Sequence, residues 1–78
     1  MTPTPRLHLD LKGLKCPLPV LRTRKALKSL TCGDEMVVET TDPLAIIDIA
    51  HMCHEDGQTL LDSTATDDGH RFFIRKDR

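Results

Sequence analysis

Cys16 is the residue whose type and position best suit covalent chemistry. It stands directly before Pro17, and Pro19 follows two residues later. Proline suits the first position of a helix because its missing N–H would lack a partner there and its φ is already helical. The pattern predicts a helix that begins at Pro17, with Cys16 as its N-cap. The positive end of the helix dipole would then favour a nucleophilic thiolate over the thiol.

Positive charge gathers around this cysteine in the sequence. The nearest basic residues are Lys12, Lys15, Arg22 and Arg24. No acidic residue occurs between Asp10 and Asp34, whereas acids are frequent from Asp34 to Asp68. Positive charge near a thiol also favours its ionisation. A single exposed lysine or arginine is usually only solvated surface, but as a group these four side chains could guide the docking of an acidic partner.

The remaining cysteines and the histidines carry weaker signals. Three cysteines without paired spacing predict reduced thiols rather than a disulfide framework. Cys53 falls on an apolar helix stripe and should be buried, while Cys32 is about a helix length from Cys16 and is not expected to pair with it. On a helix His51 and His54 share a face that Cys53 does not. Because this leaves no third ligand in register, we predict no metal site.

The elements around Cys16 alternate between strand and helix patterns. Residues 6–11 alternate leucines with polar residues, including His8, and predict a half-buried strand followed by a turn at Gly13. The first helix is predicted over residues 17–30, ending before Gly33. Its buried stripe consists of Val20, Thr23, Leu27 and Leu30, and its other face, which includes Arg24, should meet water.

The second half of the chain repeats this alternation and then closes with two strands. Residues 35–41 are rich in β-branched side chains and predict a strand. A second helix should begin with Asp42 as N-cap and Pro43 at its first position, and stop at Gly57. Its predicted core stripe is Ile46, Ile49, Ala50 and Cys53. Strands over 58–66 and 71–75, joined by a hairpin turn at 67–69, complete the chain.

These elements give the order β-α-β-α-β-β. Strands separated by helices imply crossovers, and the terminal hairpin makes the four-stranded sheet mixed. Each helix carries one apolar stripe, so both should cover one face of the sheet. We therefore predict an α/β (α+β) two-layer sandwich, formed by a single domain over residues 6–78 after a flexible N-terminal tail of residues 1–5.

Composition narrows the function classes. The sequence has no Trp or Tyr, and its net charge is −1, so binding of nucleic acid through an aromatic platform or a basic surface is not expected. It shows no secretory signal and no apolar run long enough to cross a bilayer, which predicts a cytoplasmic protein without membrane contact. An alternative stays open: a non-catalytic regulatory, nucleic-acid or protein interaction module that uses the basic first helix.

The motif and its context resemble the TusA/SirA-type sulfur-carrier family. The family signature is Cys-Pro-x-Pro, here Cys16, Pro17, Leu18 and Pro19, and the resemblance extends from about Leu7 to Lys76. It includes the Asp42-Pro43 helix start, the Asp48-Ile49 pair and the closing residues 73–76. One departure is Ala50, where many members have proline. Within the motif, Pro17, Leu18 and Pro19 would support the cysteine rather than react.

The resemblance implies a fold, a chemistry and partners. The fold would be that of the C-terminal domain of translation initiation factor 3, with sheet order 1-2-4-3. Cys16 would carry sulfur as a persulfide, in the manner of a sulfurtransferase-type carrier that needs no cofactor. For so small a carrier we expect a monomer. The donor would be a cysteine desulfurase or a rhodanese-like protein, and a downstream protein would accept the sulfur. Family roles include tRNA thiolation, molybdenum-cofactor sulfur supply and sulfur oxidation.

Overall fold

The computed structural model describes residues 5–78, so the predicted tail lies outside the described residues except for Pro5. The elements are β1 (Leu7–Asp10), α1 (Leu18–Lys28), β2 (Glu35–Thr40), α2 (Ala45–Asp56), β3 (Thr59–Ala65) and β4 (His70–Arg75). Their order is the predicted β-α-β-α-β-β. Every element also falls within the stretch predicted for it, apart from the first residue of β4.

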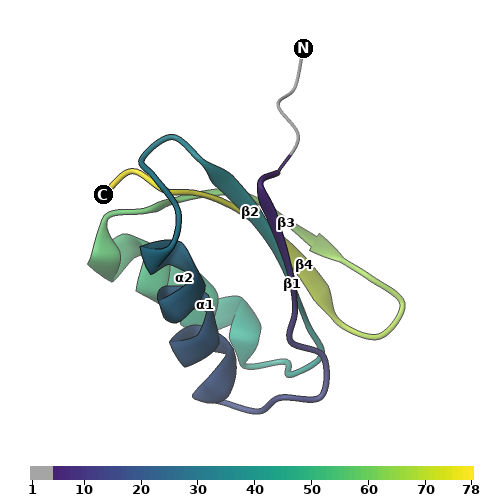
Figure 1. Ribbon diagram of the computed structural model, residues 1–78. Coiled ribbons are helices and arrows are strands. Elements are labelled where there is room, and N and C mark those ends of the chain that lie inside the picture. Colours follow the sequence, from purple (N-terminus) through teal and green to yellow (C-terminus); the bar gives the residue numbers. More distant parts are fainter. Residues whose placement is uncertain (1–4) are drawn as a thin grey trace.

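The four strands form one mixed sheet in the order β1-β2-β4-β3 (Figure 1). β1 and β2 are parallel, whereas β4 runs antiparallel to both β2 and β3. A parallel pair needs a long connection, which α1 supplies between β1 and β2, and a short hairpin suffices between β3 and β4. The sheet order expected from the family resemblance is therefore confirmed.

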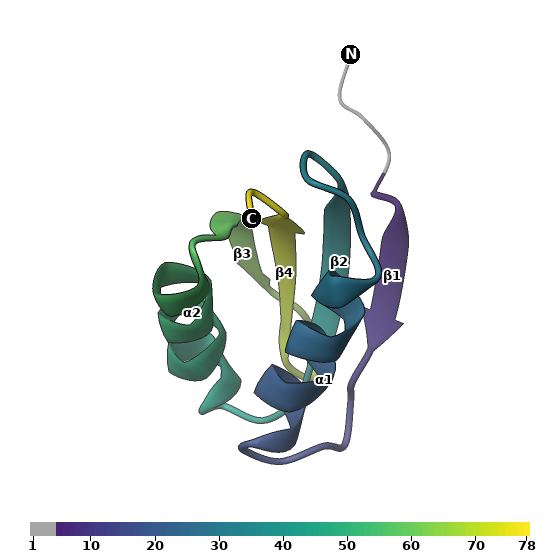
Figure 2. The same ribbon diagram turned by 60° about the vertical axis from the view of Figure 1, so that its left-hand side comes forward.

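Both helices lie on one face of the sheet, as predicted (Figure 2). The core between the layers contains side chains that are fully or almost fully buried, among them Met36, Val38, Ile49, Met52, Phe72 and Ile74. Burying each side chain of this size is worth about 1.5 to 3 kcal/mol. Because β1 and β2 are parallel, the loops that follow them lie at the same end of the sheet, and this places Cys16 near the start of α2.

Helix α1 begins one residue later than the sequence predicted. Its N-cap is Pro17 rather than Cys16, and Pro19 is the second helical residue. The reason is that the backbone of Pro17, with φ −97° and ψ 14°, is not helical. The helix also ends earlier, with Ser29 as its C-cap, although Leu30 still reaches the core.

The buried stripe of α1 largely follows the prediction: Thr23, Leu27 and Leu30 are buried, whereas Val20 is half-buried and Pro19 is buried although it was not predicted to be. Thr23 is fully buried, and its hydroxyl donates a hydrogen bond to the Pro19 carbonyl oxygen at 2.7 Å, which satisfies the polar group. Arg24 was expected to face water, but it is half-buried. Its guanidinium makes two hydrogen bonds, of 2.7 and 3.2 Å, to the Asp56 carboxylate at the end of α2.

Helix α2 differs more from its prediction. It begins at Ala45 with Leu44 as N-cap, not at Pro43 with Asp42. Its buried residues are Ala45, Ile49, Met52 and Cys53. Ile46 and Ala50 are exposed, so half of the predicted stripe was wrong. Apolar residues occupy most of the first two turns, and spacing alone could not decide which of two overlapping stripes faces the sheet. The predicted stop at Gly57 is confirmed by its left-handed φ of 74°.

Gly69, in the predicted hairpin turn, passes close to the backbone of β2. A Cβ at this position would overlap the carbonyl oxygen of Thr40. We expect Gly69→Ala to lower the free energy of unfolding by about 1 to 3 kcal/mol, because the backbone must move apart. Urea unfolding measures the change. The control is Asp67→Ala in the same turn, whose free energy of unfolding should lie within about 0.5 kcal/mol of the wild type. Equal losses in the two variants would contradict this reading.

Candidate functional site

Cys16 lies in the loop between β1 and α1, and its side chain is exposed. The loop turns into the helix through two backbone hydrogen bonds. The N–H of Leu18 donates to the Lys15 carbonyl oxygen at 2.8 Å, and the N–H of Leu21 donates to that of Pro17 at 3.1 Å. The Cys16–Pro17 peptide bond is cis. The thiol therefore stands just before the helix at a junction open to solvent.

Asp42, in the loop between β2 and α2, holds the backbone of Cys16. Its carboxylate accepts hydrogen bonds from the N–H of Cys16 at 2.7 Å and from the N–H of Leu44 at 3.0 Å. These two bonds are the main reason that the pKa of Asp42 lies below its usual value. The N–H of Gly13 also donates to Thr41 Oγ1 at 2.9 Å. Asp42 therefore joins the two loops, in addition to capping the turn that leads into α2.

Asp48, in the first turn of α2, places a second carboxylate beside the thiol. Hydrogen bonding with the Asp48 side chain is the largest cause that raises the pKa of Cys16. Desolvation and the negative charges of Asp48 and Asp42 raise it further. The expectation that basic surroundings favour the thiolate was therefore wrong. The acids that matter are 26 and 32 residues further along the chain, and only the fold brings them to the cysteine.

Cys16 borders a cavity of about 210 Å³ between α1 and α2. The lining residues are Cys16, Pro17, Val20, Arg24, Asp48, His51 and Met52. Val20 and Met52 provide an apolar wall, and Arg24, Asp48 and His51 provide polar groups. This volume is below the roughly 300 Å³ at which small-molecule pockets usually begin. It leaves room beside the thiol for an added sulfur atom and for the reacting end of a partner.

The three support residues of the motif have different environments. Pro19 is fully buried and anchors the start of α1 in the core, whereas Pro17 is exposed and lines the cavity. Leu18 is 43% exposed. His51 was considered in the sequence only as a metal ligand, and its place beside Cys16 was missed. Helical spacing from Asp48, three residues earlier, is the signal that could have indicated it.

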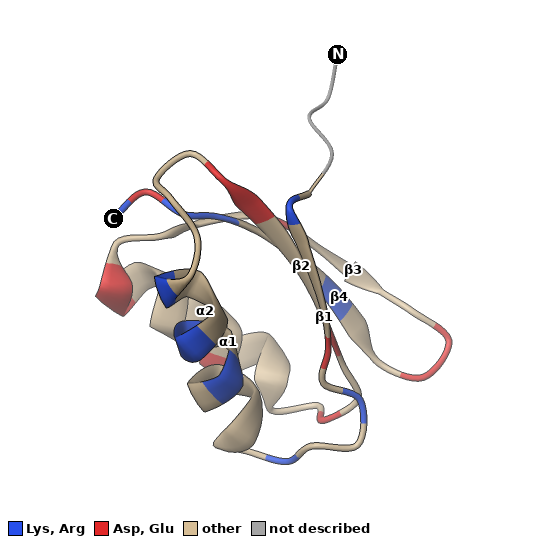
Figure 3. Cartoon of the chain, in the orientation of Figure 1, with Lys and Arg blue, Asp and Glu red and all other residues tan. Residues whose placement is uncertain are grey.

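Of the four basic residues predicted for docking, only Arg24 lines the cavity beside Cys16. Lys12, Lys15 and Arg22 are exposed. Figure 3 shows basic residues along the loop before α1 and along α1 itself. Since Arg24 is already paired with Asp56, its charge is partly balanced. A docking role for the four residues stays a prediction.

Large apolar side chains are exposed on the helices that flank the thiol, which the sequence pattern did not indicate. They are Leu18 and Leu21 of α1, Leu44 before α2, and Ile46 and Ile47 in its first turn. Ile47 is 69% exposed. In the sequence Leu44 and Ile47 lie between Asp42, which accepts the Cys16 N–H, and Asp48, which lines the same cavity as Cys16. Exposed apolar side chains of this size, when grouped, are typical of surfaces that contact other proteins.

The other cysteines differ from Cys16 in exposure and in reactivity. Cys53 is buried as predicted, and burial is the main cause that raises its pKa to about 11, so it should be unreactive. Cys32 is exposed in the turn after α1, at the opposite end of that helix from Cys16. Within residues 5–78 no three His, Cys, Asp or Glu side chains are grouped as a metal site requires. No helix among these residues is long and apolar enough to cross a membrane.

The fold and the site define a small two-layer protein that presents an exposed thiol just before a helix, beside a cavity shared by two helices. The family model for sulfurtransferase TusA matches residues 8–76. The chain therefore belongs to the TusA family of sulfur carriers.

Individual relatives agree with this assignment. The chain is 46% identical over 59 residues to a candidate sulfur carrier protein of Neisseria meningitidis serogroup A, a match that covers 76% of this chain and 80% of the relative. It is 35% identical over 69 residues to the sulfur carrier protein TusA of Allochromatium vinosum, a match that covers 88% of this chain and 91% of that protein. The crystal structure of a SirA-like protein from Desulfitobacterium hafniense has the same fold, with a TM-score of 0.80 and 24% sequence identity. The match covers 92% of this chain and 99% of that chain.

Proposed function

We propose that this protein accepts sulfane sulfur as a persulfide on Cys16 and relays it to an acceptor protein. The observation that carries the proposal is the setting of this thiol, which is exposed at a loop–helix junction and borders a cavity with room for another sulfur atom. Cys53, by contrast, is buried. Membership in a family of sulfur carriers supports the assignment.

Loading would begin with the attack of the Cys16 thiolate on the terminal sulfur of a donor protein's persulfide. A new S–S bond forms to Cys16 as the S–S bond of the donor breaks, and the donor cysteine leaves as a thiolate. The sulfane sulfur changes partner without net oxidation or reduction, so no external oxidant is needed. Delivery to the acceptor is the same kind of reaction. The acceptor's thiolate attacks the terminal sulfur of the Cys16 persulfide, and Cys16 leaves as the thiolate.

The two carboxylates beside Cys16 would keep its resting thiol protonated. Because the thiolate is the species that reacts, protonation protects an exposed cysteine from oxidation between transfers. A partner that docks over the cavity and shields Asp48, or that brings positive charge to it, would release the thiolate. In this proposal the exposed apolar side chains around the thiol would form part of the docking surface.

The donor in this proposal is a cysteine desulfurase or a rhodanese-like protein, and the acceptor is a protein of tRNA thiolation, cofactor sulfur supply or sulfur metabolism. The protein would thus act as a sulfurtransferase-type carrier in a protein-to-protein relay, not on a small substrate. The proposal places this relay in the cytoplasm, whose reducing conditions keep the thiols of a carrier and its partners available.

The proposal predicts that sulfur is gained on one particular tryptic peptide. The protein is incubated with a cysteine desulfurase and cysteine, or with a rhodanese-like donor and thiosulfate, and its intact mass is measured. We expect a gain of one sulfur atom that a reducing agent removes. Trypsin places Cys16 on the peptide of residues 16–22 and the other two cysteines on the peptide of residues 29–71. The proposal would be contradicted if the sulfur were found on the second peptide, or if neither peptide gained sulfur with either donor.

A further inference from the structure

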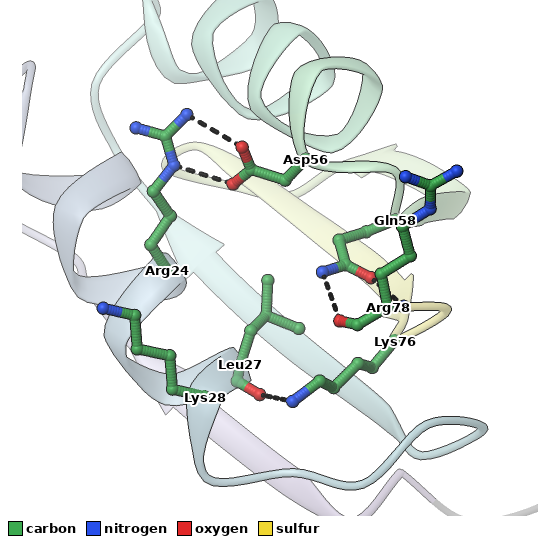
Figure 4. A pocket seen from close by; sticks show the side chains of 7 residues that line it. All are labelled: Arg24, Leu27, Lys28, Asp56, Gln58, Lys76 and Arg78. Carbon is green, nitrogen blue, oxygen red and sulfur yellow. Dashed lines mark hydrogen bonds and ion pairs between the residues drawn. The ribbon is translucent and has the colours of Figure 1, made fainter.

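A second and larger cavity, of about 430 Å³, opens at the opposite end of the helix pair (Figure 4). Its lining residues are Arg24, Leu27, Lys28, Asp56, Gln58, Lys76 and Arg78. Lys28 and Asp56 are the last residues of α1 and α2. Four of the lining side chains are positively charged and one is negatively charged. This basic cavity therefore concentrates positive charge in a chain whose net charge is −1.

The wall of the basic cavity formed by residues 76–78 is held in place by Gln58. The side-chain carbonyl of Gln58 accepts hydrogen bonds from the N–H of Asp77 at 2.8 Å and of Arg78 at 3.1 Å. Its amide Nε2 donates to the carbonyl oxygen of Arg78 at 3.0 Å. The side chain of Arg78 then crosses over Gly57, where a Cβ would lie 2.7 Å from Arg78 Cδ. The glycine that ends α2 therefore also makes space for Arg78.

Lys76 joins this wall to α1. Its Nζ donates to the carbonyl oxygens of Leu27 and Leu30, each at 2.7 Å. The Leu27 carbonyl lies in the last turn of α1, where it also accepts the N–H of Leu30 at 3.1 Å, and the Leu30 carbonyl lies just beyond the helix. The ammonium group adds a second bond to Leu27 and meets the negative end of the helix dipole. Two of its three N–H groups are used in this way, and the third is left for a ligand.

Two of the positive charges are free to bind a ligand. Arg24 is paired with Asp56, but Lys28 and Arg78 form no ion pair with another described residue. Figure 4 shows Arg24 and Lys28 on the α1 side of the hollow and Lys76 and Arg78 on the other side, with Leu27 between them. The charged ends of Lys28 and Arg78 point away from the hollow in this view, so both side chains must turn inward to meet a ligand. Because the charges are spread around the rim rather than gathered at one point, they suit a ligand with more than one anionic group.

We propose that the basic cavity binds a small molecule that carries two linked phosphate groups, held by Lys28 and Arg78. The planar guanidinium of arginine fits phosphate oxygens in pairs, and lysine adds a compact charge. The volume falls within the roughly 300 to 1,000 Å³ that is usual for small-molecule sites. No aromatic side chain is present among the described residues that line the cavity, so recognition is of the diphosphate itself. Cys16 takes no part, and the inference is independent of the persulfide chemistry.

The test is a titration of the isotope-labelled full-length protein with inorganic diphosphate, followed by NMR. We expect saturable shifts of the amide resonances of Lys28, Gln58 and Arg78, and much weaker effects from inorganic phosphate. Lys28→Ala and Arg78→Ala should each weaken diphosphate binding about tenfold, the effect of losing one charge-assisted hydrogen bond. Lys25→Ala is the matched control, because it removes the same charge from an exposed site on α1 outside the cavity.

Two further probes identify the source of the diphosphate and exclude a protein ligand. ADP that binds as tightly as inorganic diphosphate, or more tightly, would support the proposal, and the tighter case would point to nucleotides as the source. The proposal is overturned if diphosphate causes no saturable shift at millimolar concentration, or if Lys25→Ala weakens binding as much as Lys28→Ala. It is also overturned if a hexaglutamate peptide shifts the same resonances at lower concentration than diphosphate, since the cavity would then be a docking site for acidic protein segments.

Discussion

Cys16→Ser is expected to abolish persulfide loading, and Cys32→Ser is expected to leave it unchanged. A serine hydroxyl is almost the same size as a thiol but cannot form a persulfide, so the change removes the reacting atom and little else. Both cysteines are exposed, which makes Cys32→Ser the matched control for solvent access. The measurement is the fraction of protein that gains one sulfur atom in intact mass after exposure to the same donor. Loading that survives in Cys16→Ser would refute the assignment of the sulfur to this residue.

A loss of loading is informative only if the variant keeps its fold. The Cys16 side chain is exposed, and the contact that fixes this residue is made by its backbone N–H with Asp42, which serine retains. We therefore expect the free energy of unfolding of Cys16→Ser to lie within about 0.5 kcal/mol of the wild type, as for other surface substitutions. Urea unfolding followed by circular dichroism checks this, and a large loss of stability would mean that the loading result must be repeated with Cys16→Ala.

The sequence was sufficient to predict the order of the elements, because the local signals agree with one another. The alternating leucines before Gly13 mark a strand. The prolines at residues 17 and 19 mark the start of a helix, and the glycine at residue 57 marks the end of one. The sheet order needed the family resemblance, since periodicity does not show which strands are neighbours. The buried face of α2 could not be predicted, because Ile46 and Met52 fit apolar stripes equally well and only packing against the sheet selects one.

The site was predicted less completely than the fold. Its nucleophile follows from the Cys-Pro-x-Pro motif, but the electrostatic surroundings of that nucleophile do not. Sequence neighbours of Cys16 are basic, whereas its neighbours in space include Asp42 and Asp48. The charge that acts on a thiol depends on distance in the fold, and the β2–α2 loop brings in groups that no local pattern indicates. The basic cavity at Lys28 was missed for the same reason, since Arg78 closes it from the far end of the chain.

Asp48→Asn is expected to make Cys16 more reactive at neutral pH. The carboxylate raises the pKa of the thiol, because it stabilises the protonated form by hydrogen bonding and repels the negative thiolate. Asparagine has almost the same shape but no charge, so the pKa of Cys16 should fall and the thiolate fraction at neutral pH should rise. A thiolate of lower pKa is intrinsically a weaker nucleophile, but the loss is smaller than the gain in thiolate, so the net rate rises. We expect alkylation by iodoacetamide to become several-fold faster.

The pH dependence of alkylation separates this effect from a general change in exposure. In the wild type the rate should rise with pH through a midpoint above that of an ordinary thiol, and in Asp48→Asn the same rise should occur at lower pH with a similar plateau. Glu55→Gln is the matched control, because it removes one negative charge from α2 seven residues further on, roughly 10 Å along the helix. An unchanged midpoint in Asp48→Asn, or an equal shift in Glu55→Gln, would show that Asp48 does not control the thiol, and the protection of resting Cys16 would then need another cause.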